Sequence, residues 1–210
     1  MDVGDVARVY DRIARRYAAV FSDELERKPD DRRLLDAVAA GCRGTRTVLD
    51  VGCGPGHVAR YLHDAGLDVV GVDLTPAMVA EARRRHPAVS FVAADLRRLP
   101  FADGGAAGVV AFYSLIHLRR PELRGAVDGL GRVLGPGGLL LVAVHGGDGQ
   151  VHAEEFVGEP VSVDATLFSA AELTAAIEAA GCRVEEVVER PPYDFEHPTT
   201  RLYVRAHKVT

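Results

Sequence analysis

The fold is decided by one stretch, which reads Val48-Leu49-Asp50-Val51-Gly52-Cys53-Gly54-Pro55-Gly56. Three apolar residues and one acid, typical of a buried strand, lead into a segment in which every second residue is glycine. Glycine permits positive φ and lets a ligand approach the backbone closely. Residues 57–62 are typical of a helix start. A strand, a glycine turn and a helix N-terminus together predict a nucleotide-type binding site.

The spacing of these glycines does not fit a dinucleotide fingerprint. That fingerprint places its third glycine three residues after the second, whereas Gly54 and Gly56 are only two residues apart. This difference favours a ligand without a pyrophosphate. Two further apolar runs, 69–73 and 89–95, also end in acids. The first of these acids, Asp73, lies 21 residues after Gly52, about where a ribose-binding acid belongs.

Four motifs in sequence order resemble those of the class I S-adenosylmethionine-dependent methyltransferases. They are VLDVGCGPG (48–56), VVGVDLTPAMVAEAR (69–83), FVAADLRRLPF (91–101) and RVLGPGGLLLVAV (132–144). The resemblance extends over about residues 10–208 and is nearest to the quinone and natural-product branch. It implies S-adenosylmethionine as cofactor, S-adenosylhomocysteine as product, and methyl transfer to oxygen or nitrogen, or to carbon, of a small-molecule acceptor.

The order of the predicted elements indicates an α/β fold. Strands are expected at 47–51, 69–73, 89–93, 108–112 and 139–144, separated by helices at 56–65, 76–86 and 121–134. Continuous apolar strands between helices predict a parallel sheet with helices on both faces. After a helix at 169–180, segments 182–189 and 201–207 favour a terminal hairpin. With the resemblance, this gives a Rossmann-like seven-stranded, mostly parallel sheet with one antiparallel edge strand.

The length of 210 residues suits a single domain, residues 1–210. Residues 1–41 contain two helical patterns, and we expect them to contribute to a cap over the pocket. The connection 146–168 is long for a loop in a compact domain and is predicted to be a substrate lid. The segment Gly135-Pro136-Gly137-Gly138 is expected to be a structural turn.

Bulk composition argues against several classes of partner. A net charge of −5 opposes broad binding to nucleic acid, which needs a basic face. No apolar run approaches the roughly 18–20 residues that span a bilayer. The N-terminus lacks the order of a signal peptide, and the three cysteines indicate reduced thiols, so a cytoplasmic protein is expected. The sequence has no metal-ligand spacing, so no metal is expected, and it leaves the oligomeric state open.

Three acids are expected to meet at the carboxyl ends of the strands, in the crevice of the sheet. These acids, Asp50, Asp73 and Asp95, would repel one another unless a ligand offset them. S-adenosylmethionine carries ribose hydroxyls, an amine, an ammonium group and a sulfonium, and would do so.

The resemblance implies roles at the nucleoside end of the cofactor. Asp73 should accept hydrogen bonds from both ribose hydroxyls, or else be a helix-capping acid. Asp95 should accept from the adenine amine, with the Leu96 backbone N–H facing a ring nitrogen, and the alternative for Asp95 is a turn acid. Leu74 and Met78 should pack on adenine, although Met78 at helical spacing also suits a core position.

The resemblance also implies roles at the methionine end. Backbone at Gly52 and Gly54 should approach the cofactor, with Gly52 and the Phe112 carbonyl holding the amino group. Tyr17 is predicted to reach the carboxylate from the N-terminal helix, the alternative being packing. Asp50 either contacts the cofactor directly or holds the glycine loop from behind.

Candidate catalytic and acceptor-binding residues follow the fourth and fifth strands. His117 is the first candidate for a general base or acceptor contact, because imidazole titrates near neutrality. Its alternative is a partly buried histidine that bonds loop backbone. Tyr113 is predicted to shape the methyl channel. His145, His152 and Phe156 are candidate acceptor contacts, the last as an apolar wall.

Three rival functions remain open at this point. An RNA- or protein-modifying methyltransferase would use the same fold, although the acidic balance argues against it. A module that binds S-adenosylmethionine without transferring methyl is the second rival. A nicotinamide oxidoreductase is disfavoured by the spacing of the glycine loop.

Overall fold

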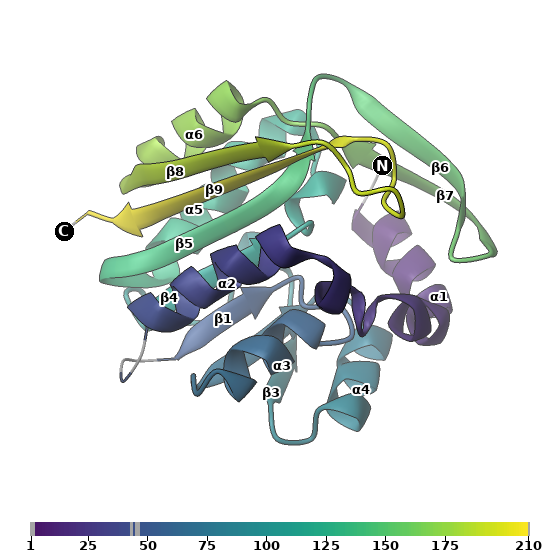
Figure 1. Cartoon of the computed structure of the whole chain (residues 1–210), viewed down its shortest axis with the longest axis horizontal. Helices are drawn as coiled ribbons and strands as arrows, with labels where there is room; N and C mark the ends of the chain where they lie inside the picture. The colour runs from purple at the N-terminus through teal and green to yellow at the C-terminus, as the bar shows by residue number, and fades with distance from the viewer. Residues whose placement is uncertain (1–2, 43, 45–46, 210) are drawn as a thin grey trace.

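The computed structural model describes residues 3–42, 44 and 47–209. Figure 1 shows one large twisted sheet flanked by helices, with a separate hairpin beside it. The helices are α1 (Val3–Phe21), α2 (Pro29–Gly41), α3 (His57–Asp64), α4 (Pro76–Arg85), α5 (Leu123–Val133) and α6 (Ala170–Ala179). Short 3-10 helices are η1 (Glu24–Arg27), η2 (Leu96–Arg98), η3 (Leu115–His117) and η4 (Arg120–Glu122). Met1 and Asp2, at the start of the expected cap, lie outside the described residues.

The large sheet contains seven strands in the order β3-β2-β1-β4-β5-β9-β8. Their bounds are β1 (Val48–Val51), β2 (Val69–Asp73), β3 (Ser90–Ala93), β4 (Ala106–Phe112), β5 (Leu134–Gly146), β8 (Cys182–Arg190) and β9 (Thr200–Lys208). The pairs among β1 to β5 are parallel, which confirms the α/β fold and the mostly parallel sheet. The strand order reverses between β1 and β4, so a crevice for a ligand is expected at their carboxyl ends.

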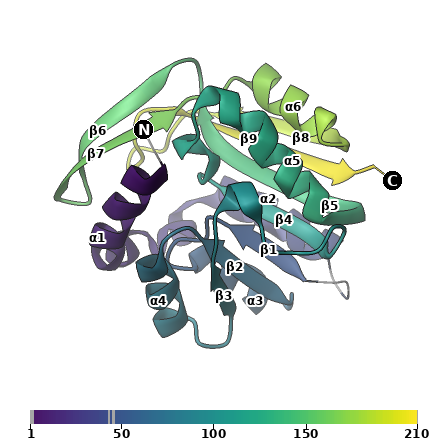
Figure 2. The same ribbon diagram turned by 180° about the vertical axis from the view of Figure 1, so that it is seen from behind.

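Side chains of the central strands alternate between two cores, as the pleat of a strand requires. Leu49, Val109 and Leu140 face a cluster that includes α5 and α6. Val48 and Val110 face a second cluster that includes α2, α3 and α4. Helices therefore cover both faces of the sheet (Figures 1 and 2), and both sides of each strand are apolar for that reason.

Two helix starts form as their sequences predict. Pro76 occupies the first turn of α4 after Thr75, although the Thr75 hydroxyl bonds Asp73 rather than the helix backbone. Ser169 and Glu172 form a reciprocal capping box at the start of α6. Such a box satisfies two otherwise unpaired backbone N–H groups.

The antiparallel strand of the large sheet, which was predicted at the edge of the sheet, lies inside it. Strand β9 runs antiparallel to both β5 and β8 and lies between them, so β8 is the edge strand. The link 191–199 turns the chain back into the gap beside β5. The predicted turn at 135–138 is also wrong, because these residues form the bulged start of β5, with a register shift opposite Ala106 and Gly108.

The connection 146–168 is largely a hairpin rather than a loop. Strands β6 (Gln150–Phe156) and β7 (Glu159–Thr166) pair antiparallel through a two-residue turn. Both turn residues, Val157 and Gly158, have positive φ, at 50° and 75°, as a type I′ hairpin turn requires. The hairpin extends from the sheet toward α1 (Figure 1), where Arg16 forms a 2.7 Å ion pair with Glu159.

Among the described residues, no helix has both the length and the apolar character needed to cross a membrane.

Candidate active site

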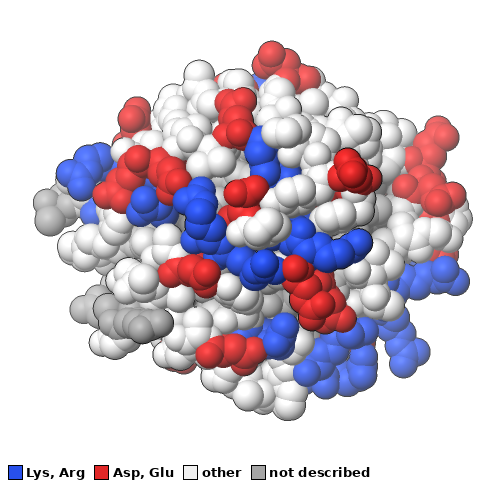
Figure 3. Space-filling model, viewed as in Figure 1, with Lys and Arg blue, Asp and Glu red and all other residues white. Residues whose placement is uncertain are grey.

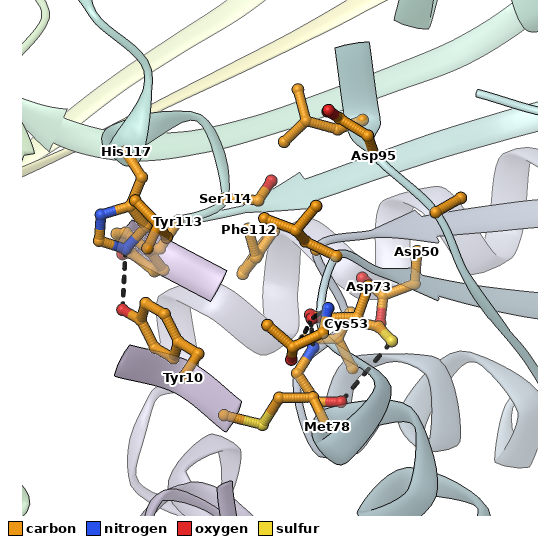
Figure 4. Close-up of a pocket in the computed structure, with 18 of the residues that line it drawn as sticks. Tyr10, Asp50, Cys53, Asp73, Met78, Asp95, Phe112, Tyr113, Ser114 and His117 are labelled. Carbon is orange, nitrogen blue, oxygen red and sulfur yellow. Dashed lines mark hydrogen bonds between the residues drawn. The ribbon is translucent and has the colours of Figure 1, made fainter. Parts of the chain in front are cut away.

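A cavity opens at the carboxyl ends of β1, β2 and β4, beside the point where the strand order reverses. Figure 4 shows the Tyr10–His117 pair on one side, Asp50 and Asp73 on the other, and Phe112 between them. The described residues that line it belong to six segments. These are α1, the start of η1, the end of β1 with the glycine loop and the start of α3, the turn from β2 into α4, the segment around η2, and the segment from Phe112 to Leu118.

The glycine loop follows β1 with a backbone that side chains would obstruct. Gly52, Gly54 and Gly56 have φ of 77°, 51° and 85°. A Cβ on Gly52 would lie 2.1 Å from the Cβ of Ser114, which no side chain tolerates. Glycine at this position therefore lets the loop pack directly against the segment after β4 and leaves backbone facing the cavity.

Asp73, the last residue of β2, is held in place by three hydrogen bonds. Its carboxylate accepts from the Gly54 N–H at 2.8 Å and from the Thr75 N–H and hydroxyl at 2.9 and 3.0 Å. A carboxylate has about four accepting positions, so the oriented group keeps capacity for a ligand hydroxyl. Burial raises the pKa of Asp73 despite these bonds. A donor or cation in the cavity would relieve that cost.

Three buried polar atoms beside the cavity have no hydrogen-bond partner among the described residues: Asp50 Oδ2, His57 Nδ1 and Ser114 Oγ. Asp50 lies within β1 and is 1% exposed. Its carboxylate also accepts from the Ala59 backbone in the first turn of α3, so it supports the loop from behind. Burial raises the pKa of Asp50 to about 7. A buried carboxylate left this incompletely satisfied fits a site completed by a cationic or hydrogen-donating ligand.

Asp95 is engaged by its neighbour Arg97. Its carboxylate accepts from the Arg97 backbone at 2.9 Å and from the guanidinium at 2.7 Å. Burial raises the pKa of Asp95, but the bonds to Arg97 outweigh it and the net pKa is lowered. An adenine amine at this position would therefore share the carboxylate with Arg97, which the sequence analysis did not anticipate.

The remaining predicted cofactor residues all line the same cavity. They are Tyr17, Leu74, Met78, Leu96 and Phe112. Tyr17 Cε1 would lie 3.7 Å from a Cβ on Gly54, so α1 crosses directly over the glycine loop. Met78 is 1% exposed and serves the core as well as the cavity wall.

Glu24 and His57 add a second polar group to the wall. His57 Nε2 lies 3.0 Å from Glu24 Oε1, and Lys28 Nζ lies 2.7 Å from Glu24 Oε2. Burial raises the pKa of Glu24, but His57 and Lys28 outweigh that effect and lower it to about 2. The sequence analysis missed Glu24, because it is one of several acids in an exposed-looking stretch.

His117 is half-buried at the end of η3 and is bonded at both ring nitrogens. Nδ1 lies 3.0 Å from the Asp164 carbonyl of β7, and Nε2 lies 2.8 Å from the Tyr10 hydroxyl of α1. Burial lowers the pKa of His117, which favours the neutral ring. Tyr10 was missed by the sequence analysis, although it shares a helical face with Tyr17, seven residues on.

Tyr113 adopts a positive φ of 53°, an uncommon conformation for a residue with a large side chain. Its hydroxyl lies 3.0 Å from that of Tyr203, which donates to Asp31 at 2.6 Å. The phenol is thus part of a buried network under β9. Because the hydroxyl is engaged in this network, the predicted role of Tyr113 in shaping the methyl channel would fall to its ring and backbone.

The three predicted acceptor contacts, His145, His152 and Phe156, are not among the described residues that line this cavity. His145 Nδ1 lies 2.7 Å from the Thr199 hydroxyl, and its ring packs tilted against the Tyr113 ring, 5.3 Å between centroids. His152 pairs with the Asp164 carboxylate, its partner across the hairpin. Phe156 instead packs against Tyr10 and Tyr17, and therefore supports the cavity from outside.

Comparisons with known proteins agree on one family. A family model described as a methyltransferase domain matches residues 48–138. The chain is 42% identical over 145 residues to a demethylmenaquinone methyltransferase of Beutenbergia cavernae, covering 68% of this chain and 58% of that protein. It is 36% identical to a malonyl-[acyl-carrier protein] O-methyltransferase of Enterobacter lignolyticus, covering 67% and 53%. The chain thus spans little more than half the length of these curated relatives.

A solved structure shares the fold. The S-adenosylmethionine-dependent methyltransferase from Methanosarcina mazei superposes with a TM-score of 0.74 at 16% identity, covering 82% of this chain and 97% of that one. The motifs, the strand order and these matches point the same way. The chain belongs to the class I S-adenosylmethionine-dependent methyltransferases.

Proposed function

We propose that this protein transfers a methyl group from S-adenosylmethionine to an oxygen or nitrogen atom of a small-molecule acceptor. The observation that carries the proposal is the set of acids around the glycine loop. Asp50 is buried and Asp73 half-buried, both have raised pKa values, and Asp50 Oδ2 lacks a partner among the described residues. A cationic ligand with hydroxyl groups satisfies this site, and S-adenosylmethionine is such a ligand.

Each end of the cofactor has residues of suitable chemistry. Asp73 would bind the ribose, while Leu74, Met78 and Leu96 would surround adenine, with Asp95 shared between Arg97 and the adenine amine. Near the methionine end, Gly52 and the Phe112 carbonyl would hold the amino group, with Asp50 behind them. Tyr17 would cover this end from α1.

When bound, S-adenosylmethionine supplies a methyl group already activated by its sulfonium. The chain's own contribution is then chiefly to hold the acceptor atom in line with that methyl group and to exclude water. Helix α1 would exclude water from the cavity, because it contributes four of the lining residues: Val3, Val6, Tyr10 and Tyr17. His117 serves proton removal, as the neutral imidazole nearest the acceptor side.

Small-molecule acceptors are favoured over nucleic acid or protein. The demethylmenaquinone relative is named for such an acceptor. Over much of the face in Figure 3, Lys and Arg side chains are interspersed with Asp and Glu, while blue side chains gather at its lower right without forming a stripe across it. Ion pairs such as Arg33–Glu186 and Arg205–Glu185 show that basic side chains lie next to acidic ones. A nucleic-acid surface instead needs a continuous basic stripe.

Calorimetric titration with S-adenosylmethionine and S-adenosylhomocysteine tests the cofactor, with Asp73→Ala beside the wild type. Micromolar binding that the substitution abolishes is the expected result. Absence of binding to the wild type would contradict the proposal. Mass-spectrometric detection of methylated acceptor then separates an enzyme from a module that only binds the cofactor.

A further inference from the structure

The half of the cavity beyond the glycine loop has an apolar wall with one polar pair in it. Val3, Val6 and Tyr10 follow one another on the inner face of α1, at helical spacing. Leu118 faces the same cavity just after η3. In Figure 4, the Tyr10 hydroxyl points to His117 on the side away from Asp50 and Asp73. This half is therefore where an acceptor would meet the chain.

The charged side chains that line the cavity leave no cation for an anionic acceptor. Among the described lining residues, the arginine is Arg97, which is bonded to Asp95 and also lies 3.3 Å from Glu122. The other basic groups are His57, paired with Glu24, and the neutral His117. Acids outnumber cations over the lining of the cavity as a whole, which disfavours a carboxylate or phosphate group on the acceptor.

The hydrogen bonds define which atom donates in the Tyr10–His117 pair. The Asp164 carbonyl can only accept, so His117 Nδ1 carries the hydrogen of the neutral ring. Nε2 is then a bare acceptor, and the Tyr10 hydroxyl donates to it. A phenol that donates its hydrogen still has lone pairs with which to accept. Tyr10 is thereby set up to receive a hydrogen bond from a ligand hydroxyl.

We propose that Tyr10 binds the hydroxyl group of the acceptor, and that this subsite takes an uncharged, mainly apolar molecule carrying such a hydroxyl. The inference rests on the function proposed above and deepens it. As the acceptor oxygen forms its bond to the methyl carbon and the carbon–sulfur bond breaks, the hydroxyl proton passes to Tyr10 Oη. The Tyr10 proton passes in the same step to His117 Nε2.

This relay keeps the charge of the closed cavity constant. The positive charge lost from sulfur reappears on the imidazolium of His117, whose Nδ1–H remains bonded to the Asp164 carbonyl. No separated charge is created in a low-dielectric site, where it would be costly. The proton returns through Tyr10 to water when the cavity opens. Tyr10 is then the catalytic residue, and His117 acts through it.

Binding of matched aromatic probes tests the inference without turnover. Phenol and 2-naphthol, with benzoate and 2-naphthoate as their charged counterparts, are titrated into protein saturated with S-adenosylhomocysteine. We expect each hydroxyl compound to bind at least about tenfold more tightly than its carboxylate counterpart. Tyr10→Phe should weaken 2-naphthol binding by about five- to tenfold and leave S-adenosylhomocysteine binding unchanged. Tyr61→Phe is the control, because that hydroxyl bonds Asp36 on the surface.

Nitrogen-15 NMR of the His117 ring provides a second readout. The wild type should show a protonated Nδ1 and a bare Nε2 whose signal shifts when 2-naphthol binds, and Tyr10→Phe should abolish that shift. Equal binding of naphthoate, no binding of the hydroxyl probes, or an unaffected Tyr10→Phe protein would overturn the inference. If S-adenosylhomocysteine itself fails to bind, the proposed function fails first, so the two failures are distinguishable.

Discussion

The two halves of the cavity are built in different ways. The centre of the cofactor half lies within one stretch, residues 50–75, in which backbone N–H groups of the glycine loop and the β2–α4 turn hold Asp73. The acceptor half joins three segments distant in sequence: α1, η3 and β7. Side-chain bonds connect them, chiefly Tyr10 to His117, His117 to Asp164, and Arg16 to Glu159.

This contrast separates rigidity from adaptability. The glycine loop, proposed to hold the cofactor, packs directly against the segment after β4 and cannot move without disturbing that contact. The acceptor half depends instead on contacts between a helix and a hairpin, among them the packing of Phe156 on Tyr10 and Tyr17 and the partly exposed Arg16–Glu159 pair. Cofactor recognition is therefore fixed by the fold, whereas acceptor recognition is set by parts that can change independently.

Among the substitutions predicted here, Gly52→Ala should have the largest effect, a loss of stability in the cofactor half. The added Cβ would clash with Ser114 and force an alanine to a φ of 77°. We expect unfolding by urea to show a loss of about 2–5 kcal/mol, the sum of overpacking and left-handed backbone strain. Gly66→Ala is the matched control, with φ of 94° and nothing within 4 Å of its Cβ. Equal losses in both variants would mean that the close approach to Ser114 is unimportant.

Asp73→Asn tests cofactor binding by a substitution that, unlike Gly52→Ala, does not change the size of the side chain. The amide keeps the size of the side chain but loses its charge, and one of its atoms can no longer accept hydrogen bonds. Affinity for S-adenosylhomocysteine should fall roughly 10- to 100-fold, the usual effect of losing a hydrogen bond to a charged group. Calorimetry measures this, with Asp68→Asn as a control outside the cavity. Retained affinity would show that the ribose is not bound at Asp73.

Asp50→Asn should affect stability and binding in opposite directions. Burial raises the pKa of Asp50 from 3.8 to about 7, so the stability contributed by its neutral form is full below pH 3.8 and lost as the pH rises through about 7. An asparagine stays neutral, so we expect the variant to have a higher Tm than the wild type at pH 8. This advantage should disappear near pH 4.

Cofactor binding provides the other side of the same test. Because the carboxylate is expected to balance the positive charge of the bound cofactor, Asp50→Asn should bind S-adenosylmethionine more weakly at pH 8. Thermal unfolding and calorimetry on one preparation compare the two effects. A lower Tm together with unchanged affinity would contradict the role given to Asp50.

Arg16→Ala is expected to have the smallest effect and sharpens the acceptor side of the comparison. The Arg16 side chain is 63% exposed, so losing its bond to Glu159 should cost no more than about 1 kcal/mol of global stability. Hydrogen exchange of the α1 amides should nevertheless accelerate, because the helix loses a tie to the hairpin. Arg60→Ala removes a comparable exposed pair on α3 and should leave α1 exchange unchanged.

The same contrast explains what the sequence could reveal. Asp73 and the glycine loop are predictable because local spacing brings them together, and so are the apolar strands that carry them. The partner of His117 was not predictable, because Tyr10 lies 107 positions away and meets it only through the packing of α1.

Two features of the fold were missed for related reasons. The β6–β7 hairpin has alternating side chains, but its turn is only two residues long and its Val157 takes a positive φ without the usual Asn or Asp. The interior position of β9 depends on which neighbour a returning strand pairs with. Hydrophobic pattern identifies a strand but does not choose between an edge and a gap in the sheet.

The placement of Tyr10 and Tyr17 on one helix restricts insertions and deletions more than substitutions. Seven residues make two helical turns to within about 20°, so both side chains face the cavity, roughly 10 Å apart along the axis. One residue inserted between them would rotate Tyr10 by about 100° and leave Tyr17 in place. Substitutions along α1 can therefore alter the proposed acceptor subsite without moving it. A change of length between these two positions would separate that subsite from the proposed cofactor site.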